Sequence, residues 1–136
     1  MFADARTRGP QIPFYDVDVE HGLKHLEHLE PESNLILSPV GACDLAMCYT
    51  GRAMGALVPP GTVVLLKAVD RDAIIPGGEY AIVSRKIVTL RIVRAADEED
   101  KVRLVAGDRE NYDDILLNVS DIVAVYKVKG KLIINS

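Results

Sequence analysis

The stretch YTGRAMGALVPPG, residues 49–61, combines a glycine turn with a short segment that leads into a valine-rich run. Gly51 permits a tight turn, and Gly61 opens the run TVVLLKAV, whose β-branched residues favour a strand. A reactive serine would suit this turn, but Ala53 stands there and Arg52 precedes it. The stretch therefore predicts a strand, a turn with a short helix and a second strand. It leaves open whether the turn ever carried chemistry.

Strand-like runs of apolar residues recur along the chain, separated by glycine, proline and acidic turns. They cover residues 12–19, 44–49, 62–69, 79–84, 87–95, 101–107, 115–119 and 121–134. About seven short strands at such spacing, with little helix, predict an all-β domain of packed, curled sheets. Leu23, Leu26 and Leu29 lie three residues apart and predict about two turns of amphipathic helix, which Pro31 ends.

The length and charge of the chain limit its organisation and its partners. Residues 1–11 are polar and without periodicity, which indicates an N-terminal tail or linker, and residues 12–136 are expected to form one domain. The net charge of −4 excludes the basic surface that binding of duplex DNA or RNA requires. The longest apolar run is too short to span a bilayer, and the N-terminus lacks the apolar core of a signal peptide. We therefore expect a cytoplasmic protein without membrane contact.

Histidines and cysteines offer a metal site as an alternative that the sequence disfavours. His21, His25 and His28 fall close together, and a zinc or nickel site is conceivable there. No cysteine or further histidine completes a set of ligands, so an exposed helix face is the simpler interpretation. Cys43 and Cys48 lack the spacing of a redox or metal-binding pair, and we interpret them as small buried hydrophobic residues. No metal and no cofactor are expected.

A set of short motifs follows the opening stretch in a fixed order. They are Gly51-Arg52-Ala53-Met54, Gly61-Thr62-Val63-Val64, Gly78-Glu79-Tyr80-Ala81-Ile82, Leu90-Arg91-Ile92-Val93-Arg94, Asn111-Tyr112-Asp113 and Val128-Lys129-Gly130. This order resembles the C-terminal domain of LexA and the phage repressors, a family of self-cleaving serine/lysine peptidases. The resemblance implies a β-clip type fold of curled sheets with little helix. It covers roughly residues 12–134.

The residues that carry the chemistry of that family are replaced in this chain. The nucleophilic serine corresponds to Ala53, which has no oxygen to attack with, and the lysine base corresponds to Arg91. A lysine acts as a base once burial frees its amine, whereas an arginine stays protonated at any useful pH. The scissile bond of the family would fall at His21–Gly22. The resemblance therefore implies a peptidase-like domain without catalytic residues, in which these positions are vestigial.

Other residues of the motif have a structural interpretation. Gly51, Met54 and Gly61 are expected to provide a tight turn, a core side chain and the start of a strand. The family's two aspartates are replaced by Arg52 and Thr62. The nearest hydroxyls in sequence, on Thr50 and Ser84, are expected to be solvated rather than nucleophilic.

The last strand offers an interface. Ile122, Ala124, Tyr126 and Val128 form an apolar alternation, and the opposite face of the same run is half apolar. Such a strand meets a partner or lies inside the monomer, and the pattern favours neither. Because the C-terminal region of LexA-type domains contributes to their dimer contact, we take these four residues as the candidate interface of a homodimer.

Three functions follow as hypotheses. The first is a catalytically inactive LexA-like domain for dimerisation and regulation of a bacterial or phage transcription regulator, with DNA bound only through a separate helix-turn-helix segment. The second is a UmuD-like self-processing serine peptidase that uses unconventional residues. The third is a stand-alone module that binds a peptide or an anion in the vacated groove with Arg52 and Arg91. Against the third stands the simpler expectation that Arg91 pairs with a carboxylate or reaches solvent.

Overall fold

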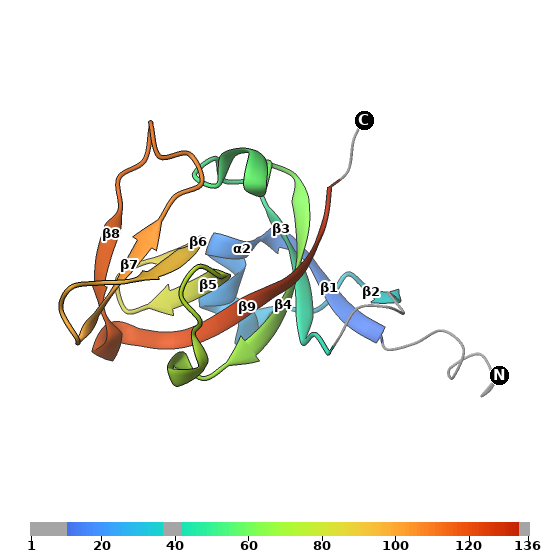
Figure 1. Cartoon of the computed structure of the whole chain (residues 1–136). Helices are drawn as coiled ribbons and strands as arrows, with labels where there is room; N and C mark the ends of the chain where they lie inside the picture. Colours follow the sequence, from blue (N-terminus) through green and yellow to red (C-terminus); the bar gives the residue numbers. More distant parts are fainter. Residues whose placement is uncertain (1–10, 37–41, 134–136) are drawn as a thin grey trace.

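The computed structural model describes residues 11–36 and 42–133 (Figure 1). The expected tail over residues 1–11 lies outside these ranges except for Gln11, which begins the first strand. The strands are β1 (Gln11–Asp18), β2 (Ser33–Ile36), β3 (Leu45–Tyr49), β4 (Thr62–Val69), β5 (Glu79–Ser84), β6 (Val88–Ala95), β7 (Lys101–Val105), β8 (Ile115–Asn118) and β9 (Ile122–Leu132). The helical segments are α2 (Val19–Gly22) and the 3-10 helices η1 (Leu23–His28), η2 (Gly55–Leu57), η3 (Arg71–Ala73) and η4 (Val119–Asp121).

The prediction of a mostly β chain is confirmed, but the strands form one open sheet rather than packed sheets. The nine strands follow the order β2-β1-β3-β4-β9-β5-β6-β7-β8. All neighbouring pairs are antiparallel except β1 with β3. Figure 1 shows the long β9 running across the molecule between β4 and β5. The strand expected as an interface is therefore central for most of its length.

The sheet curls so that its two halves share a core. Three strands separate β3 from β6, so a flat sheet would hold them about 19 Å apart, at about 4.8 Å per strand. One apolar cluster nevertheless contains Leu45 and Met47 of β3 together with Leu90 of β6. Val19 of α2 and Leu23 of η1 belong to the same cluster, so the helical segment fills the concave side of the curl.

The helical segment begins earlier than the leucine spacing predicts. Asp18 ends β1 and caps α2, because its carboxylate accepts a hydrogen bond from the Glu20 N–H at 3.0 Å. The other oxygen of Asp18 accepts from the backbone N–H and the hydroxyl of Thr50, both at 2.8 Å. A tertiary contact thus fixes where the chain turns from strand to helix. Across the described ranges, every helix falls short of the length and apolar character that a bilayer crossing requires.

Candidate functional site

The turn after β3 is held rigidly by a loop from the other half of the molecule. The Ala53 carbonyl accepts a hydrogen bond from the Asp108 N–H at 2.9 Å. Gly107 packs so closely against this turn that an added Cβ would overlap the carbonyl group of Met54. Ala53 and Met54 are buried, and Met54 belongs to the main core cluster, as expected for a core side chain. The loop between β7 and β8 therefore clamps the turn at Ala53.

Both glycines that flank the turn are required, for different reasons. Gly61 has a φ of +93°, a left-handed conformation that other residues adopt only with strain. Gly51 has no such conformation, but a Cβ there would lie 2.8 Å from the Tyr49 hydroxyl oxygen. The Tyr49 ring thus lies against the turn that follows its own strand. Gly51 makes room for a side chain rather than for an unusual backbone angle.

The Tyr49 hydroxyl is buried beside the turn at Gly51 without a hydrogen-bond partner among the described residues. Burial is the main cause that raises the pKa of Tyr49 to about 12, and the charge of Glu20 adds to it. The Met54 backbone amide and the Arg91 charge lower this pKa, although the amide does not reach hydrogen-bond geometry. No sequence motif singled out Tyr49.

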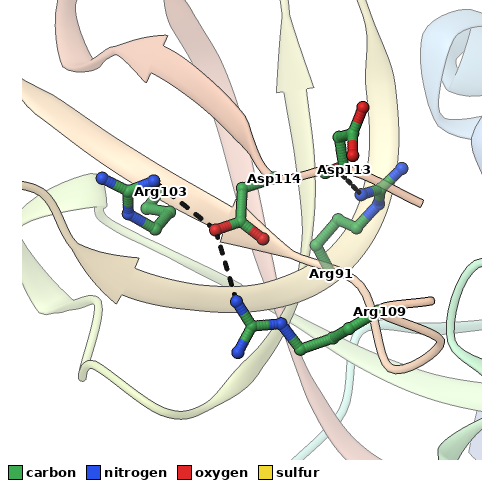
Figure 2. Close-up of polar contacts among 5 residues, drawn as sticks. All are labelled: Arg91, Arg103, Arg109, Asp113 and Asp114. Atoms are coloured by element: carbon green, nitrogen blue, oxygen red, sulfur yellow. Dashed lines mark hydrogen bonds and ion pairs between the residues drawn. The ribbon is translucent and has the colours of Figure 1, made fainter. Parts of the chain in front are cut away.

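Arg91 is locked in place rather than solvated or paired with an acid (Figure 2). It is only 8% exposed. Its Nε donates to the Thr89 hydroxyl at 3.2 Å, and its Nη1 donates to the Asp113 carbonyl oxygen at 3.3 Å. Its guanidinium carbon lies 5.9 Å from the centre of the Tyr112 ring. The expectation of a carboxylate partner or of solvent contact is wrong, because a backbone carbonyl and an aromatic face take those roles.

A pair of arginines fixes the loop that holds Arg91. In Figure 2 the Asp114 carboxylate lies between Arg103 and Arg109, at 3.4 Å and 3.7 Å from their guanidinium nitrogens. The neighbouring Asp113 supplies the carbonyl that binds Arg91. The loop from β7 to β8 therefore holds both the turn at Ala53 and the guanidinium of Arg91.

A cavity of about 450 Å³ opens beside the turn, but the two arginines do not converge in it. Arg52, Asp108 and Tyr112 contribute to its wall together with Gly55, Pro60 and Asn111. Arg91 does not line the cavity and approaches only the Tyr112 ring. A ligand in this cavity would meet one cation, Arg52, and the carboxylate of Asp108. Arg52 and Arg91 therefore do not line a common surface on which they could bind one ligand together.

The peptide bond between His21 and Gly22 lies within helical structure. Both residues belong to α2, and Gly22 is buried against Val17 and Met47. The Glu20 carboxylate accepts a hydrogen bond from the Leu90 N–H of β6 at 3.0 Å, which ties the helix to the sheet. A peptide bond held in this way is not presented as an extended substrate.

The two hydroxyls expected to be solvated are both engaged in hydrogen bonds. Thr50 donates to the Asp18 carboxylate, as described above. Ser84 is buried, donates to the Ile87 carbonyl at 2.8 Å and accepts from the Ile87 N–H at 3.0 Å. The expectation of solvation is wrong for Ser84, because its hydroxyl closes the turn between β5 and β6. The Thr50 hydroxyl therefore has a carboxylate beside it, whereas the Ser84 hydroxyl bonds only backbone groups within the described part of the chain.

The histidines lie along one short segment without forming a metal-binding group. The rings of His21 and His25 are 5.3 Å apart, and His28 pairs with Glu27 at 3.4 Å in an exposed position. Within residues 11–36 and 42–133, no three histidine, cysteine or acidic side chains come together as ligands.

The four residues of the candidate interface lie mostly inward. Ile122 is buried in the cluster that contains Tyr80 and Leu104. Tyr126 and Val128 are half-buried against the main core cluster, and Ala124 is half-buried. Their apolar pattern is therefore explained by packing within the monomer.

Comparison with known proteins identifies no relative: no protein-family model matches the chain, and no curated protein matches it. Any assignment of function therefore rests on the residues and on the geometry described above. That geometry combines a clamped turn without a hydroxyl, an immobilised arginine and a buried phenol.

Proposed function

We propose that this chain is a catalytically inactive LexA-like C-terminal domain of the β-clip type. It would serve dimerisation and regulation of a bacterial or phage transcription regulator. DNA would be bound by a separate helix-turn-helix segment, and no cofactor is needed. Two things support the proposal. The first is the resemblance of the ordered motifs to this family, and the second is the set of contacts made by the turn and by Arg91.

The observation that carries the proposal is a closely held turn that has Ala53 at the motif position of the serine, together with a buried Arg91 at that of the lysine. Ala53 is fixed by the Asp108 N–H and by the close approach of Gly107, yet it offers only a methyl group. Arg91 is held by two hydrogen bonds as a permanent cation, which cannot accept a proton. A serine peptidase needs a hydroxyl and a base within hydrogen-bond reach. A scaffold kept without them is suited to binding and assembly rather than to cleavage.

The segment around His21 and Gly22 supports the same conclusion. Self-cleavage needs an exposed, extended peptide at the nucleophile, because the reacting groups must meet in a narrow geometry. Here Gly22 is buried in α2, and the Glu20 bond to Leu90 anchors that helix. Presentation of this bond would require the helix to leave the core.

The end of β9 supports self-association. β4 pairs with β9 as far as Leu132, whereas β5 pairs with it only as far as Lys127. Among the described residues, no strand pairs with the other edge of Val128–Leu132. Leu132 and Ile133 are exposed beside this edge. An open strand edge with apolar flanks is a ready site for pairing with a second copy.

Light scattering coupled to size exclusion, over a wide range of protein concentration, tests the dimer. We expect a dimer whose association weakens at least tenfold in the variant Leu132→Asp/Ile133→Asp, because two carboxylates would be buried at the paired edges. The control Ile75→Asp/Leu116→Asp makes the same chemical change at exposed residues elsewhere. A wild-type chain that stays monomeric at all concentrations contradicts this part of the proposal.

Prolonged incubation at alkaline pH separates the inactive domain from the self-processing peptidase. Intact-mass spectrometry over several days should show only the full chain, because Ala53 has no hydroxyl and Arg91 stays protonated. A product that begins at Gly22 would overturn the inactive assignment and favour the UmuD-like alternative. An intact monomer would instead favour the stand-alone binding module.

A further inference from the structure

A second cleft, separate from the vestigial site, collects positive charge. It has a volume of about 380 Å³ and lies between the helical segment α2–η1 and the turn that joins β5 to β6. Lys24 contributes from the helical side, and Arg85 and Lys86 contribute from the turn. All three residues are exposed, and within the described part of the chain none of them has a carboxylate at ion-pair distance. Three cations that form no ion pair among the described residues therefore line one cleft in a chain whose net charge is −4.

The acidic residues of the cleft are already engaged. Asp18 accepts hydrogen bonds from the Glu20 N–H and from both donors of Thr50. Glu20 accepts the Leu90 N–H. Both carboxylates thus bind neutral donors of the protein itself and stay negatively charged. The lining therefore carries three cations against two anions, and these hydrogen bonds hold the carboxylates on the α2 side of the cleft.

The turn that carries two of these cations is rigid. The Ser84 hydroxyl donates to the Ile87 carbonyl and accepts from the N–H groups of Lys86 and Ile87. The Ser84 N–H also bonds the Ile87 carbonyl at 2.8 Å, and the Arg85 N–H bonds the Asp121 carbonyl at 3.1 Å. The backbone beneath both side chains is therefore fixed before any ligand arrives, which lowers the entropy cost of binding.

We propose that this cleft binds a small multivalent oxyanion through Lys24, Arg85 and Lys86. An arginine presents a planar fork that matches two oxygens of one phosphate or carboxylate, and lysines add point charges. The volume falls within the range of small-molecule sites, which is larger than one monovalent ion needs. The shared chemistry is a cluster of anionic oxygens, supplied by phosphoryl groups or by several carboxylates on one molecule. This proposal is independent of the LexA-like assignment.

Titration followed by ¹H–¹⁵N correlation spectra tests the site, with tripolyphosphate and tricarballylate as probes at constant ionic strength. We expect saturable shifts for amides of residues 18–24 and 84–88 with at least one probe. Tighter binding of tripolyphosphate would identify a phosphoryl ligand, and tighter binding of tricarballylate a polycarboxylate. Absence of saturable shifts with both probes would overturn the proposal.

The variant Arg85→Gln/Lys86→Gln should weaken the affinity about tenfold or more, because two charge-assisted contacts are lost. Its spectrum also reports directly whether the fold is intact. Arg94→Gln/Lys129→Gln removes the same charge from exposed positions outside the cleft and should change the affinity less than about twofold, as expected for screened distant charges. If both variants weaken the affinity equally, anion binding depends only on the net charge of the protein, and a defined site is refuted.

Discussion

The Tyr49 hydroxyl is a buried polar group without a hydrogen-bond partner in residues 11–36 and 42–133, and it lies against the turn at Gly51. A buried donor that makes no hydrogen bond costs free energy, so its removal is neutral or favourable. We expect Tyr49→Phe to leave the free energy of unfolding at pH 7 unchanged or to raise it by up to about 1 kcal/mol. Urea denaturation followed by circular dichroism measures this change. A loss of more than about 1 kcal/mol would indicate a partner that the hydroxyl does not show here.

The same residue predicts how stability depends on alkaline pH. Burial raises the pKa of Tyr49 to about 12, whereas an unfolded tyrosine titrates near pH 10. Between these values the unfolded chain releases a proton that the folded chain keeps, so stability present below pH 10 is lost as the pH rises toward 12. The loss from this group should be roughly 2 kcal/mol. Tyr49→Phe should remove that part of the decline, while Tyr126→Phe should leave it in place.

Sequence patterns singled out Ala53 and Arg91 but did not describe their surroundings. The order of motifs drew attention to both residues, and their assignment as former catalytic positions remains part of the proposal. The contacts of Arg91 were not foreseen, since its partner Asp113 lies 22 residues away and acts through a backbone carbonyl. Every residue has a backbone carbonyl, so no residue type in the sequence predicts this contact. Gly107, which clamps the turn, was also missed, because its role is visible only once two loops have met.

At the scale of elements, Glu20 joins α2 to the sheet. Its carboxylate bonds the Leu90 N–H, and β7 pairs with β6 only from Ile92 onward, so no β7 strand covers this amide. We expect Glu20→Ala to lower the free energy of unfolding by about 1–3 kcal/mol, because the amide loses its acceptor. Glu20→Gln keeps an acceptor oxygen and should cost less.

Hydrogen exchange of the Leu90 amide is the direct measurement for this contact. In Glu20→Ala the amide should exchange faster, together with those of residues 19–28, if the carboxylate anchors the helix. Unchanged exchange at Leu90 would show that core packing of Val19 and Leu23 alone holds the segment.

The elements that the sequence predicted well are those with strong alternation or continuous apolar runs. β4 and the β5–β6 hairpin begin and end within a few residues of the expected bounds. The start of α2 was missed, because Val17 and Val19 continue the strand alternation of β1 and the capping contacts of Asp18 include the distant Thr50. β2 was not assigned as a strand, because it is only four residues long and its apolar residues show no clear alternation.

At the scale of the whole molecule, β9 joins the two halves of the curled sheet. Of the three core clusters among the described residues, the one around Tyr80 and Leu104 contains Ile122 and Val125, whereas Tyr126 and Val128 pack against the main cluster. A single strand thus contributes to both clusters and pairs with β4 and β5 on its two sides. One half cannot unfold without withdrawing apolar contacts from the other. The described chain should therefore behave as one cooperative unit.

Core truncations in the two clusters test this cooperativity. Met47→Ala in one cluster and Leu117→Ala in the other should each lower the free energy of unfolding by about 2–5 kcal/mol, since both side chains are buried. If the halves unfold together, each variant shifts the urea midpoint without changing the slope of the transition. Tyrosine fluorescence and far-ultraviolet circular dichroism should give the same midpoint in every variant. Separate midpoints for the two probes, or a shallower slope in one variant, would mean that β9 does not couple the halves.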